Sequence, residues 1–555
     1  MKAEAPPANV RTPVLCRPAL LWTLVGLGAA LRIFQYASDT SFWFDELSLV
    51  RNLVHRSAAQ LATEPLRYDQ VAPVGFLVAE KGISRVLGES DLAFRFLLLP
   101  IGLAALVLFV PLARRVLDGY AVPFAVAMFA IGAPFIRYCA EVKQYGIDIA
   151  SVIVMSLLTL RLRDPDATRG RCIAAGLLGA VLVWFSQATI LILAGLGGAL
   201  LLAWLLERDG RTARALRITV PIWAAACVAA ALVAFRLVSS TTRAFMDQFW
   251  RFRGGFPPWP IRKPGDLVWP WNRVTELFAE DTLLRYRWPV VYTALAVIGL
   301  VLLWRRHRVV ALVLLAPFAA AVAAAVAQQY PFRARLVLYV APGLVLAIAQ
   351  GAEGIRRAAS RLHPALGAVC MAAIFAGPAW SLARFPPPYF VEDHKTVLAY
   401  VRDHRQPGDA VYVYSYEIEA IERYAAEYGL APGDYEVGRC SKVDRRFSLR
   451  EVDRYRGRPR VWVIAGAVPP FQPPRQTLEQ YLSTIGVPRA SIVIEGMRPI
   501  APVSATLFDL SDPKRLETAT AETFPLVTPP PGSPMAFPVN CGPWVEPLSP
   551  DVERR

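Results

Sequence analysis

The sequence has 555 residues, of which 55% are hydrophobic, and its mean hydropathy is +0.37. A soluble protein of this length does not need so much apolar surface for its core, so the composition predicts membrane spans. The formal net charge is +16. In a membrane protein basic residues collect in cytoplasmic loops, so we do not expect a nucleic-acid partner.

Apolar runs of about 17 to 25 residues, the length that crosses a bilayer, recur along the first two thirds of the chain. The first is long and lacks a small-residue cleavage site behind it, so we interpret it as a retained span and not as a signal peptide. We expect about eleven transmembrane helices, at 19–37, 94–113, 120–136, 147–162, 172–185, 189–206, 218–238, 288–304, 309–327, 336–350 and 365–383.

The basic clusters orient these spans. With the N-terminus inside, the positive-inside rule is met by every cluster, at 11–17, 114–115, 161–171, 208–217, 305–308 and 356–361. The opposite face then receives 38–91, 137–146, 239–287, 328–335 and everything after 384. Because the unusual polar residues gather in these outer segments, we expect one site on this face.

The first outer segment places Asp45 and Glu46 directly after the aromatic run Ser41-Phe42-Trp43-Phe44, which suits a membrane interface. Apolar residues then recur at helical spacing, at Leu47, Val50 and Val54, which predicts a helix lying in the interface plane. The two carboxylates could simply complement the positive N-terminus of that helix. Alternatively, one could be a general base that takes a proton from an acceptor hydroxyl.

The second outer segment, 137–148, is a dense polar run between two apolar spans. Ionisable groups at membrane depth are costly and are therefore functional candidates. If the run is helical, Glu141, Tyr145 and Asp148 share a face, while Lys143 points elsewhere or lies in a turn before the helix. The alternative is an ion pair between Glu141 and Lys143 or Arg137 that only ends the two spans.

Two further outer segments are unusual. Arg333 and Arg335 lie on the outer side, where the positive-inside rule disfavours basic residues. The guanidinium group of an arginine can bind two oxygens of a lipid phosphate. Alternatively, both side chains could simply extend to the lipid headgroups. The long segment 239–287 has the composition of a mobile lid at headgroup level. It carries Trp250, Trp259, Trp269 and Trp271, which could stack on a sugar ring or anchor the interface.

Taken together, the motifs resemble the C-type glycosyltransferase (GT-C) superfold, specifically the clan of dolichyl-phosphate-mannose protein mannosyltransferases and the bacterial lipid A aminoarabinose transferase. The chain departs from that pattern at Val71-Ala72-Pro73-Val74, where the family often has His-Pro-Pro-Leu, and at Leu336, where an aromatic residue is common. The resemblance covers roughly 20–383 and is carried by Phe44-Asp45-Glu46, Asp69-Gln70-Val71-Ala72-Pro73, the run 87–95, Glu141-Val142-Lys143-Gln144-Tyr145, and Arg335 with Pro342.

The resemblance implies a polytopic α-helical membrane protein with the GT-C fold and an inverting transfer of sugar. The donor would be a polyprenyl-phosphate sugar, and the acceptor a glycolipid, polysaccharide or protein at the periplasmic face of a bacterial inner membrane. Asp45 would be the catalytic base and Glu46 its helper. The donor and its phosphate would be held by Glu141, Lys143, Tyr145, Arg333 and Arg335, with Arg95, Asp148, Trp269 and Trp271 as further pocket candidates.

Two other functions stay open at this point. A lipid-linked-sugar flippase also needs many spans and intramembrane charge, but the sequence lacks two similar halves with matching interrupted spans. A membrane-anchored binding protein would leave Asp45 and Glu141 unexplained.

After Arg384 the chain changes character, with a proline-rich linker at 385–389. We expect helices at 394–404 and 417–428, a strand at 410–414, buried strands at 460–464 and 491–494, and capping boxes at Ser448/Glu451 and Thr477/Gln480. Alternating strands and helices predict a small periplasmic α/β domain. The expected organisation is a cytoplasmic N-terminus at 1–18, the transmembrane domain at 19–384, the α/β domain at 385–512 and a Pro-rich, disordered tail at 513–555.

The seven cysteines and five histidines constrain the chemistry only weakly. Cys139, Cys440 and Cys541 fall on the outer side, where Cys440 and Cys541 could form a disulfide. The histidines lack zinc-ligand spacing. No cofactor is firmly indicated, although Asp45, Glu46 and Glu141 could converge on a magnesium or manganese ion.

Overall fold

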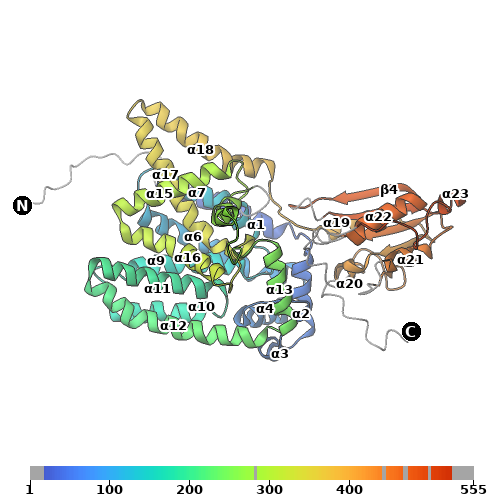
Figure 1. Ribbon diagram of the computed structural model, residues 1–555, viewed down its shortest axis with the longest axis horizontal. Helices are drawn as coiled ribbons and strands as arrows, with labels where there is room; N and C mark the ends of the chain where they lie inside the picture. The colour runs from blue at the N-terminus through green and yellow to red at the C-terminus, as the bar shows by residue number, and fades with distance from the viewer. Residues whose placement is uncertain (1–17, 280–283, 440–445, 467–472, 498–501, 528–555) are drawn as a thin grey trace, which may run out of the picture. The chain divides into compact units, whose positions relative to one another are not determined.

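The computed structural model describes residues 18–279, 284–439, 446–466, 473–497 and 502–527. These residues form two compact units, each assembled from segments that are far apart in the sequence (Figure 1). Unit 1 comprises Met1–Ala37, Arg95–Ala234 and Gly255–Pro387, and unit 2 comprises Ser38–Phe94, Phe235–Gly254 and Pro388–Arg555.

All the regular elements that the structure describes in unit 1 are helices. Figure 1 shows α10, α11 and α12 side by side, and Trp223 of α12 donates its indole N–H to the Ala175 carbonyl of α10 at 3.1 Å. The helices of this unit are α1 (Pro18–Ala37), α6 (Leu98–Val116), α7 (Ala121–Ile131), α8 (Ala133–Arg137), α9 (Tyr145–Arg161), α10 (Arg169–Leu182), α11 (Ala188–Glu207), α12 (Gly210–Leu237), η2 (Pro264–Val268), α14 (Trp269–Glu276), α15 (Pro289–Arg306), α16 (Arg308–Val326), η3 (Ala334–Val340), α17 (Ala341–Ser360) and α18 (Pro364–Arg384).

Eight helical segments in the described part of the chain are long and apolar enough to cross a membrane. The chain is therefore a multi-pass membrane protein. Three expected spans coincide with shorter helices: α9 has 17 residues and α10 has 14, and the run 120–136 is interrupted at Gly132, which separates α7 from α8. The eight segments are Pro18–Ala37, Asp91–Val116, Ala188–Glu207, Gly210–Leu237, Pro289–Arg306, Arg308–Val326, Ala334–Ser360 and Pro364–Arg384.

Small residues allow the closest helix contact of this bundle. A Cβ on Gly299 of α15 would meet the Ala347 carbonyl oxygen of α17 at 1.8 Å, and one on Gly351 would meet the Leu295 carbonyl oxygen at 2.2 Å. Without a hydrophobic driving force between helices in lipid, such close backbone packing is a main source of association. Glycine is therefore required at both positions.

A buried arginine secures the interruption between α7 and α8. Arg32 of α1 is fully buried and donates to the carbonyls of Gly28, Ala130 and Phe129 at 2.8, 3.1 and 3.2 Å. The last carbonyls of a helix have no partner within it. Arg32 therefore caps the C-terminal end of α7, where a positive charge also complements the helix dipole.

Unit 2 combines short helices with one sheet. Its helices are α2 (Phe44–His55), α3 (Ala58–Thr63), α4 (Val74–Leu87), α5 (Asp91–Arg95), α13 (Ser240–Phe252), α19 (His394–His404), η4 (Ser415–Glu417), α20 (Ile418–Tyr424), α21 (Phe447–Asp453), α22 (Pro473–Ile485) and α23 (Pro513–Leu516). Its strands are β1 (Ala410–Val413), β2 (Glu436–Val437), β3 (Val461–Ala465), β4 (Val487–Ile494) and β5 (Val503–Asp509).

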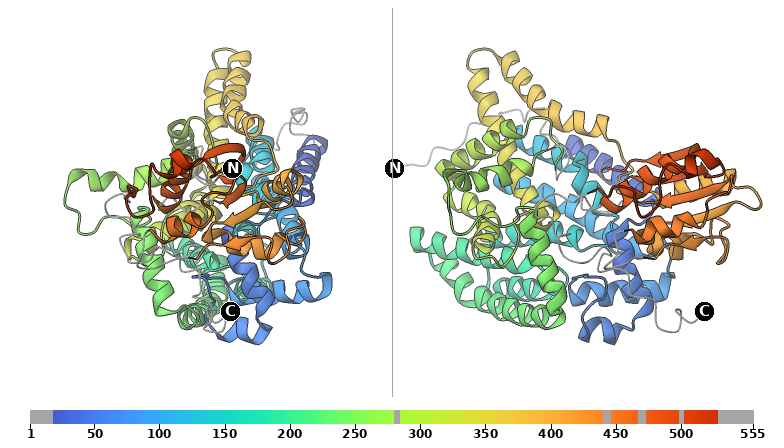
Figure 2. Two further views of the ribbon diagram at one scale, coloured as in Figure 1. Left: turned by 90° about the vertical axis from the view of Figure 1, so that its right-hand side faces the viewer. Right: turned by 45° about the vertical axis from the view of Figure 1, so that its right-hand side comes forward.

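The sheet has the order β2-β1-β3-β5-β4, with β1 parallel to both β2 and β3, and β5 antiparallel to both β3 and β4. Alternate residues of each strand face opposite layers. Tyr412 shares a core with Leu449 of α21 and Leu478 of α22, whereas Trp462 lies on the other face, 6.0 Å from the Tyr400 ring of α19. Figure 2 shows the strands and helices of this domain in orange and red. Helices thus cover both faces of a small α/β domain.

Several sequence expectations for this domain need correction. Ser448 and Thr477 do not open helices, because α21 begins at Phe447 and α22 at Pro473, so both lie inside a helix. The strand expected at 491–494 begins at residue 487 and is not buried; it is an edge strand with a mostly exposed pattern. Residues 513–527, expected to be part of the tail, contain α23 and contribute Phe524 to the domain core.

Candidate functional site

The polar run of the second outer segment folds into a buried turn in unit 1. Arg137 ends α8, and its guanidinium lies 2.5 Å from the Glu141 carboxylate. The backbone N–H of Lys143 donates to the Glu141 carbonyl at 2.6 Å, and α9 begins at Tyr145. Arg137, Glu141 and Lys143 are all less than 9% exposed. The structure therefore contains the ion pair between Glu141 and Arg137 that the sequence analysis gave as an alternative, and Lys143 lies in the turn before α9.

A second arginine joins this turn from η3. Arg335 donates from Nε to the Tyr145 hydroxyl at 2.9 Å, and its guanidinium carbon lies 5.7 Å from the centroid of the Tyr145 ring. It is also near enough to Arg137 for their charges to repel. The Arg137 and Arg335 guanidinium groups thus lie near one another, Arg335 binds Tyr145, and Lys143 belongs to the same buried turn. We call these residues with Glu141 the cationic cluster.

Carboxylate and amide oxygens lie beside the cationic cluster. Asp148 is 2% exposed, and the Ser186 hydroxyl hydrogen-bonds it. Among the residues that the structure describes, no donor reaches Glu141 Oε1, Gln144 Oε1 or Asp148 Oδ1. Buried acceptors of this kind are normally satisfied by water or by hydroxyls of a ligand.

The other candidates of unit 1 have different surroundings. Arg333 is 2.6 Å from the Glu276 carboxylate, which Arg273 approaches at the same distance. Trp269 is buried and packs edge-on against Phe332 at 6.3 Å, whereas Trp271 is 49% exposed. Arg95 is buried at the end of α5. The sequence did not predict that Glu276 would balance Arg333.

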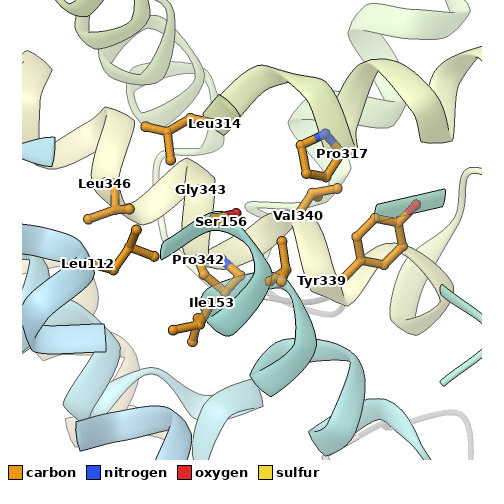
Figure 3. A pocket seen from close by; sticks show the side chains of 11 residues that line it. Leu112, Ile153, Ser156, Leu314, Pro317, Tyr339, Val340, Pro342, Gly343 and Leu346 are labelled. Atoms are coloured by element: carbon orange, nitrogen blue, oxygen red, sulfur yellow. The ribbon is translucent and has the colours of Figure 1, made fainter. Parts of the chain in front are cut away.

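The cavity drawn in Figure 3 lies deeper among the helices of unit 1. Side chains of α6, α9, α16, η3 and α17 line it, including Ser156 and Tyr339. Its volume of about 10 Å³ has room for at most about one water molecule. It is therefore a packing void and not a substrate pocket.

The first acidic pair begins α2 in unit 2. Glu46 is buried, and its carboxylate accepts from the Trp43 backbone N–H at 3.4 Å, as the glutamate of a capping box does. Asp45 is half-buried, and its Oδ1 accepts from the Gln70 side-chain amide at 3.1 Å. Glu46 therefore has the helix-capping role, while Asp45 is held in one orientation by Gln70.

The loop that presents Gln70 is conformationally strained. Tyr68 and Asp69 have φ angles of 61° and 47°, in the left-handed region that non-glycine residues rarely adopt. Asp69 accepts from the Thr242 hydroxyl of α13 at 2.7 Å, and burial raises the pKa of its carboxyl while this hydrogen bond opposes the rise. Such strain persists only where surrounding contacts impose it and is frequent at functional sites.

A second polar group of unit 2 was missed by sequence reasoning. Glu392 of the C-terminal segment accepts from the backbone N–H of Phe44 at 2.7 Å, and buried His394 lies between Glu392 and Glu417. Glu392 and His394 follow the linker at 385–389, and nothing in the sequence around them indicates a contact with Phe44. Only the fold brings them to the start of α2.

The structure thus gathers Glu141, Lys143, Tyr145, Asp148 and Arg335 in unit 1, and Asp45 with Gln70 in unit 2. No group of three or more His, Cys, Asp or Glu side chains in the described part of the chain could hold a metal ion. Asp45 and Glu141 belong to different units, so an ion held by both stays a prediction. Cys139 is buried and unpaired, and Cys440 and Cys541 lie outside the described residues.

Three of the solved structures to which this chain is similar are the following. One is the oligosaccharyltransferase of Archaeoglobus fulgidus in complex with zinc and sulfate, at 13% identity and a TM-score of 0.45, over 73% of this chain and 61% of that one, which is less than two thirds of its length. Another is ArnT from Cupriavidus metallidurans bound to undecaprenyl phosphate, at 12% identity and a TM-score of 0.46, over 88% and 98% of the two chains. A third is the Archaeoglobus fulgidus oligosaccharyltransferase AglB with an inhibitory peptide and a dolichol-phosphate, at 12% identity and a TM-score of 0.44, over 83% and 70%.

No protein-family model matches the sequence, and no curated protein sequence matches it significantly. With identities near 12% and TM-scores below 0.5, the structural similarities do not by themselves establish a family or an activity.

Proposed function

We propose that this protein is an inverting glycosyltransferase. It moves a sugar from a polyprenyl-phosphate-linked donor to a glycolipid, polysaccharide or protein acceptor at the periplasmic face of a bacterial inner membrane. The observation that carries the proposal is the cationic cluster: Arg137 is paired with Glu141, Arg335 binds the Tyr145 hydroxyl, and Lys143 is buried in the same turn. A buried group of cationic side chains among apolar helices is suited to an anionic ligand, and a lipid phosphate is an anion that reaches this depth.

The reaction needs a base and a stabilised leaving group. The acceptor oxygen bonds to the anomeric carbon while the bond from that carbon to the phosphate oxygen breaks, so the configuration inverts and polyprenyl phosphate departs with the electron pair. Asp45 takes the hydroxyl proton of the acceptor. Lys143 and Arg335 neutralise the charge that develops on the phosphate, so no general acid is required.

The remaining residues have supporting roles. Arg137 is paired with Glu141 and shapes the turn that carries Lys143. The buried oxygens of Glu141, Gln144 and Asp148 are suited to accept hydrogen bonds from sugar hydroxyls. Arg333, with its charge shared by Glu276, is assigned to the lipid headgroup region, together with exposed Trp271.

The orientation of the protein follows from the basic clusters, which we assign to the cytoplasm. Residues 38–91 and the domain after 384 then lie in the periplasm. Asp45 belongs to the segment 38–91. This assignment places it on the periplasmic side, where a base that acts on a periplasmic acceptor has to be.

The test is transfer of radiolabelled sugar from polyprenyl-phosphate donors by the purified, full-length protein. We expect Asp45→Asn, a near-isosteric change, to lower kcat about 10²- to 10⁴-fold. Glu64→Gln removes an exposed carboxylate of the same unit and is the matched control. Arg335→Gln should lower turnover by about 10²-fold or more, while Arg262→Gln at an exposed site should not.

The outcomes separate the alternatives. Equal turnover of wild type and Asp45→Asn would move the base to another residue. No turnover with any donor, alongside saturable transport of lipid-linked sugar in vesicles, would refute the transferase and support a flippase. Activity that is lost in EDTA and restored by magnesium or manganese would add a divalent ion to the mechanism, and activity that persists in EDTA would remove it.

A further inference from the structure

A buried histidine lies between two carboxylates at the start of α19. His394 is 4% exposed, its Nε2 lies 3.3 Å from Glu392 Oε2, and its Nδ1 lies 3.1 Å from Glu417 Oε2. Its ring is stacked near Tyr424 of α20, with centroids 6.5 Å apart and an interplanar angle of 21°. An imidazole with a carboxylate at each nitrogen can donate to both only when it is protonated.

The same Glu392 oxygen that faces His394 also binds α2. Glu392 Oε2 accepts from the Phe44 backbone N–H at 2.7 Å. Phe44 is the first residue of α2, and its N–H is one of the donors that a helix cannot satisfy internally. Asp45 is the next residue. The N-terminus of the helix that carries the proposed base is therefore capped by a side chain about 350 residues away in the sequence.

Other contacts hold the same face of α2 against the C-terminal domain. The Ser48 hydroxyl donates to Glu419 at 2.9 Å, and Arg51 lies 3.2 Å from Glu422. Phe44, Ser48 and Arg51 follow one another at helical spacing. On the preceding loop, the Phe42 N–H donates to the Tyr424 hydroxyl at 2.8 Å. Of these groups, the Glu392 cap lies nearest in sequence to Asp45.

We propose that His394 is a positioning residue for the transfer reaction: by fixing the Glu392 carboxylate on the Phe44 N–H, it sets the N-terminus of α2 and hence the direction of the Asp45 carboxylate. This inference rests on the proposed function of Asp45 as the base. His394 touches neither substrate nor the reacting atoms and acts only through Glu392.

Electrostatics favour a charged imidazole here. Burial alone would lower the pKa of His394, but the carboxylates of Glu417 and Glu392 outweigh it and raise the pKa to about 10. Burial also raises the pKa of Glu392, with Glu417 adding to the rise and His394 opposing it. The other ionisable groups around them include Glu419, near Glu392, and Tyr414, near Glu417. Tyr424 stacks on His394 and in turn contacts Lys395 with its ring and Asp91 with its hydroxyl.

The fold makes specific room for the second carboxylate. A Cβ on Gly466, which follows β3, would lie 1.7 Å from Glu417 Oε1. Only glycine permits this approach of carboxylate to backbone. Gly466→Ala would therefore displace Glu417 from His394 without changing any charge, and it provides a test that is independent of titratable substitutions.

The experiment compares His394→Gln, Glu392→Ala and Glu392→Gln with His404→Gln as the matched control. His404 ends the same helix, and its side chain contacts Tyr400 of that helix by stacking and by a hydrogen bond to the Tyr400 carbonyl. Two readouts are taken on the full-length protein: steady-state transfer, and amide hydrogen exchange of the peptide that contains residues 43–47. The exchange readout does not depend on activity.

We expect His394→Gln and Glu392→Ala to lower kcat by about tenfold or more while KM changes by less than about twofold, because geometry and not binding is lost. Both should speed exchange at 43–47, and His404→Gln should do neither. Glu392→Gln keeps an acceptor for the Phe44 N–H and should stay closer to wild type. Glu417→Gln removes one of the two carboxylates that raise the pKa of His394, so the alkaline loss of kcat should move toward neutral pH by about one unit or more.

Unchanged exchange at 43–47 in both His394→Gln and Glu392→Ala would overturn the positioning role, whatever happens to transfer. An alkaline limb that does not move in Glu417→Gln and Gly466→Ala would also overturn it, even if His394→Gln proved too unstable to assay. Faster exchange with no loss of transfer would show that Glu392 caps α2 but would overturn the role of His394 in the transfer reaction. The base role of Asp45 would fail separately, through equal turnover of wild type and Asp45→Asn. The two proposals therefore fail in distinguishable ways.

Discussion

Glu80 offers a direct test of the energetics of unit 2. It lies on α4, its side chain is fully buried, and neither carboxylate oxygen has a hydrogen-bond partner among the described residues. Burial raises the pKa of this carboxyl well above its ordinary value. The group is therefore kept protonated in the folded protein at pH values where it ionises in the unfolded chain.

The magnitude follows from what burial costs. An unsatisfied buried polar group destabilises a protein by about 1–3 kcal/mol. Glu80→Met fills a similar volume without the two oxygens, so we expect it to stabilise the protein by about that amount at pH 7.5. For a domain of about 150–250 residues, each kcal/mol corresponds to about 2–4 °C in Tm.

The pH dependence has a definite sign. Because the folded-state pKa is raised, the native state binds more protons than the unfolded state above the ordinary pKa of 4.5. The contribution of Glu80 to stability therefore falls as pH rises from the unfolded toward the folded pKa. Acidification should stabilise wild type more than it stabilises Glu80→Gln.

Thermal unfolding in detergent, followed at several pH values, measures both effects. Glu64→Gln, at an exposed position of the same unit, is the control and should change neither Tm nor its pH dependence. A loss of more than about 1 kcal/mol in Glu80→Met would contradict the reasoning, since it would mean that the carboxylate makes a stabilising interaction.

Three further predictions concern unit 1. Tyr145→Phe removes only the hydroxyl that Arg335 binds at 2.9 Å, so transfer should fall by about two- to tenfold, which is less than in Arg335→Gln. The double variant should transfer sugar no more slowly than Arg335→Gln alone. Arg32→Met leaves the α7 carbonyls that Arg32 caps without donors, so thermal unfolding should show a loss of about 2–4 kcal/mol. Gly351→Ala places a Cβ 2.2 Å from a carbonyl oxygen and should cost about 1–3 kcal/mol, whereas Gly198→Ala on α11, with nothing within 4 Å, should be neutral or stabilising in the same unfolding assay.

Local patterns anticipated much of the fold. Apolar runs predicted the long helices of unit 1, and the helix at 394–404 was placed with both of its ends correct. Hydrophobic periodicity decides such elements because each is buried along one whole face. The capping boxes at Ser448 and Thr477 failed because a short Ser/Thr-to-Glu/Gln pattern also occurs inside helices, where tertiary packing sets the start.

Part of the candidate site was likewise predictable from local sequence, and part was not. The run 137–148 could be recognised from the sequence because its ionisable residues lie between apolar spans. The Arg137–Glu141 ion pair could also be foreseen, because its two residues are four positions apart. The ion pair between Arg333 and Glu276 was not predictable, because neither the sequence spacing nor the composition links the last residue of α14 to the residue before η3.

The sequence by itself determined that the chain is a membrane protein with a mixed C-terminal domain, and it singled out Asp45, Glu141, Lys143 and Arg335. Composition and periodicity are sufficient for this because burial in lipid requires unbroken apolar length. Only the tertiary structure decided that the loop around Asp45 belongs to the same unit as the domain after Arg384. The Phe44 N–H needs an acceptor, and a folded chain can supply one from any distance along the sequence, here from Glu392.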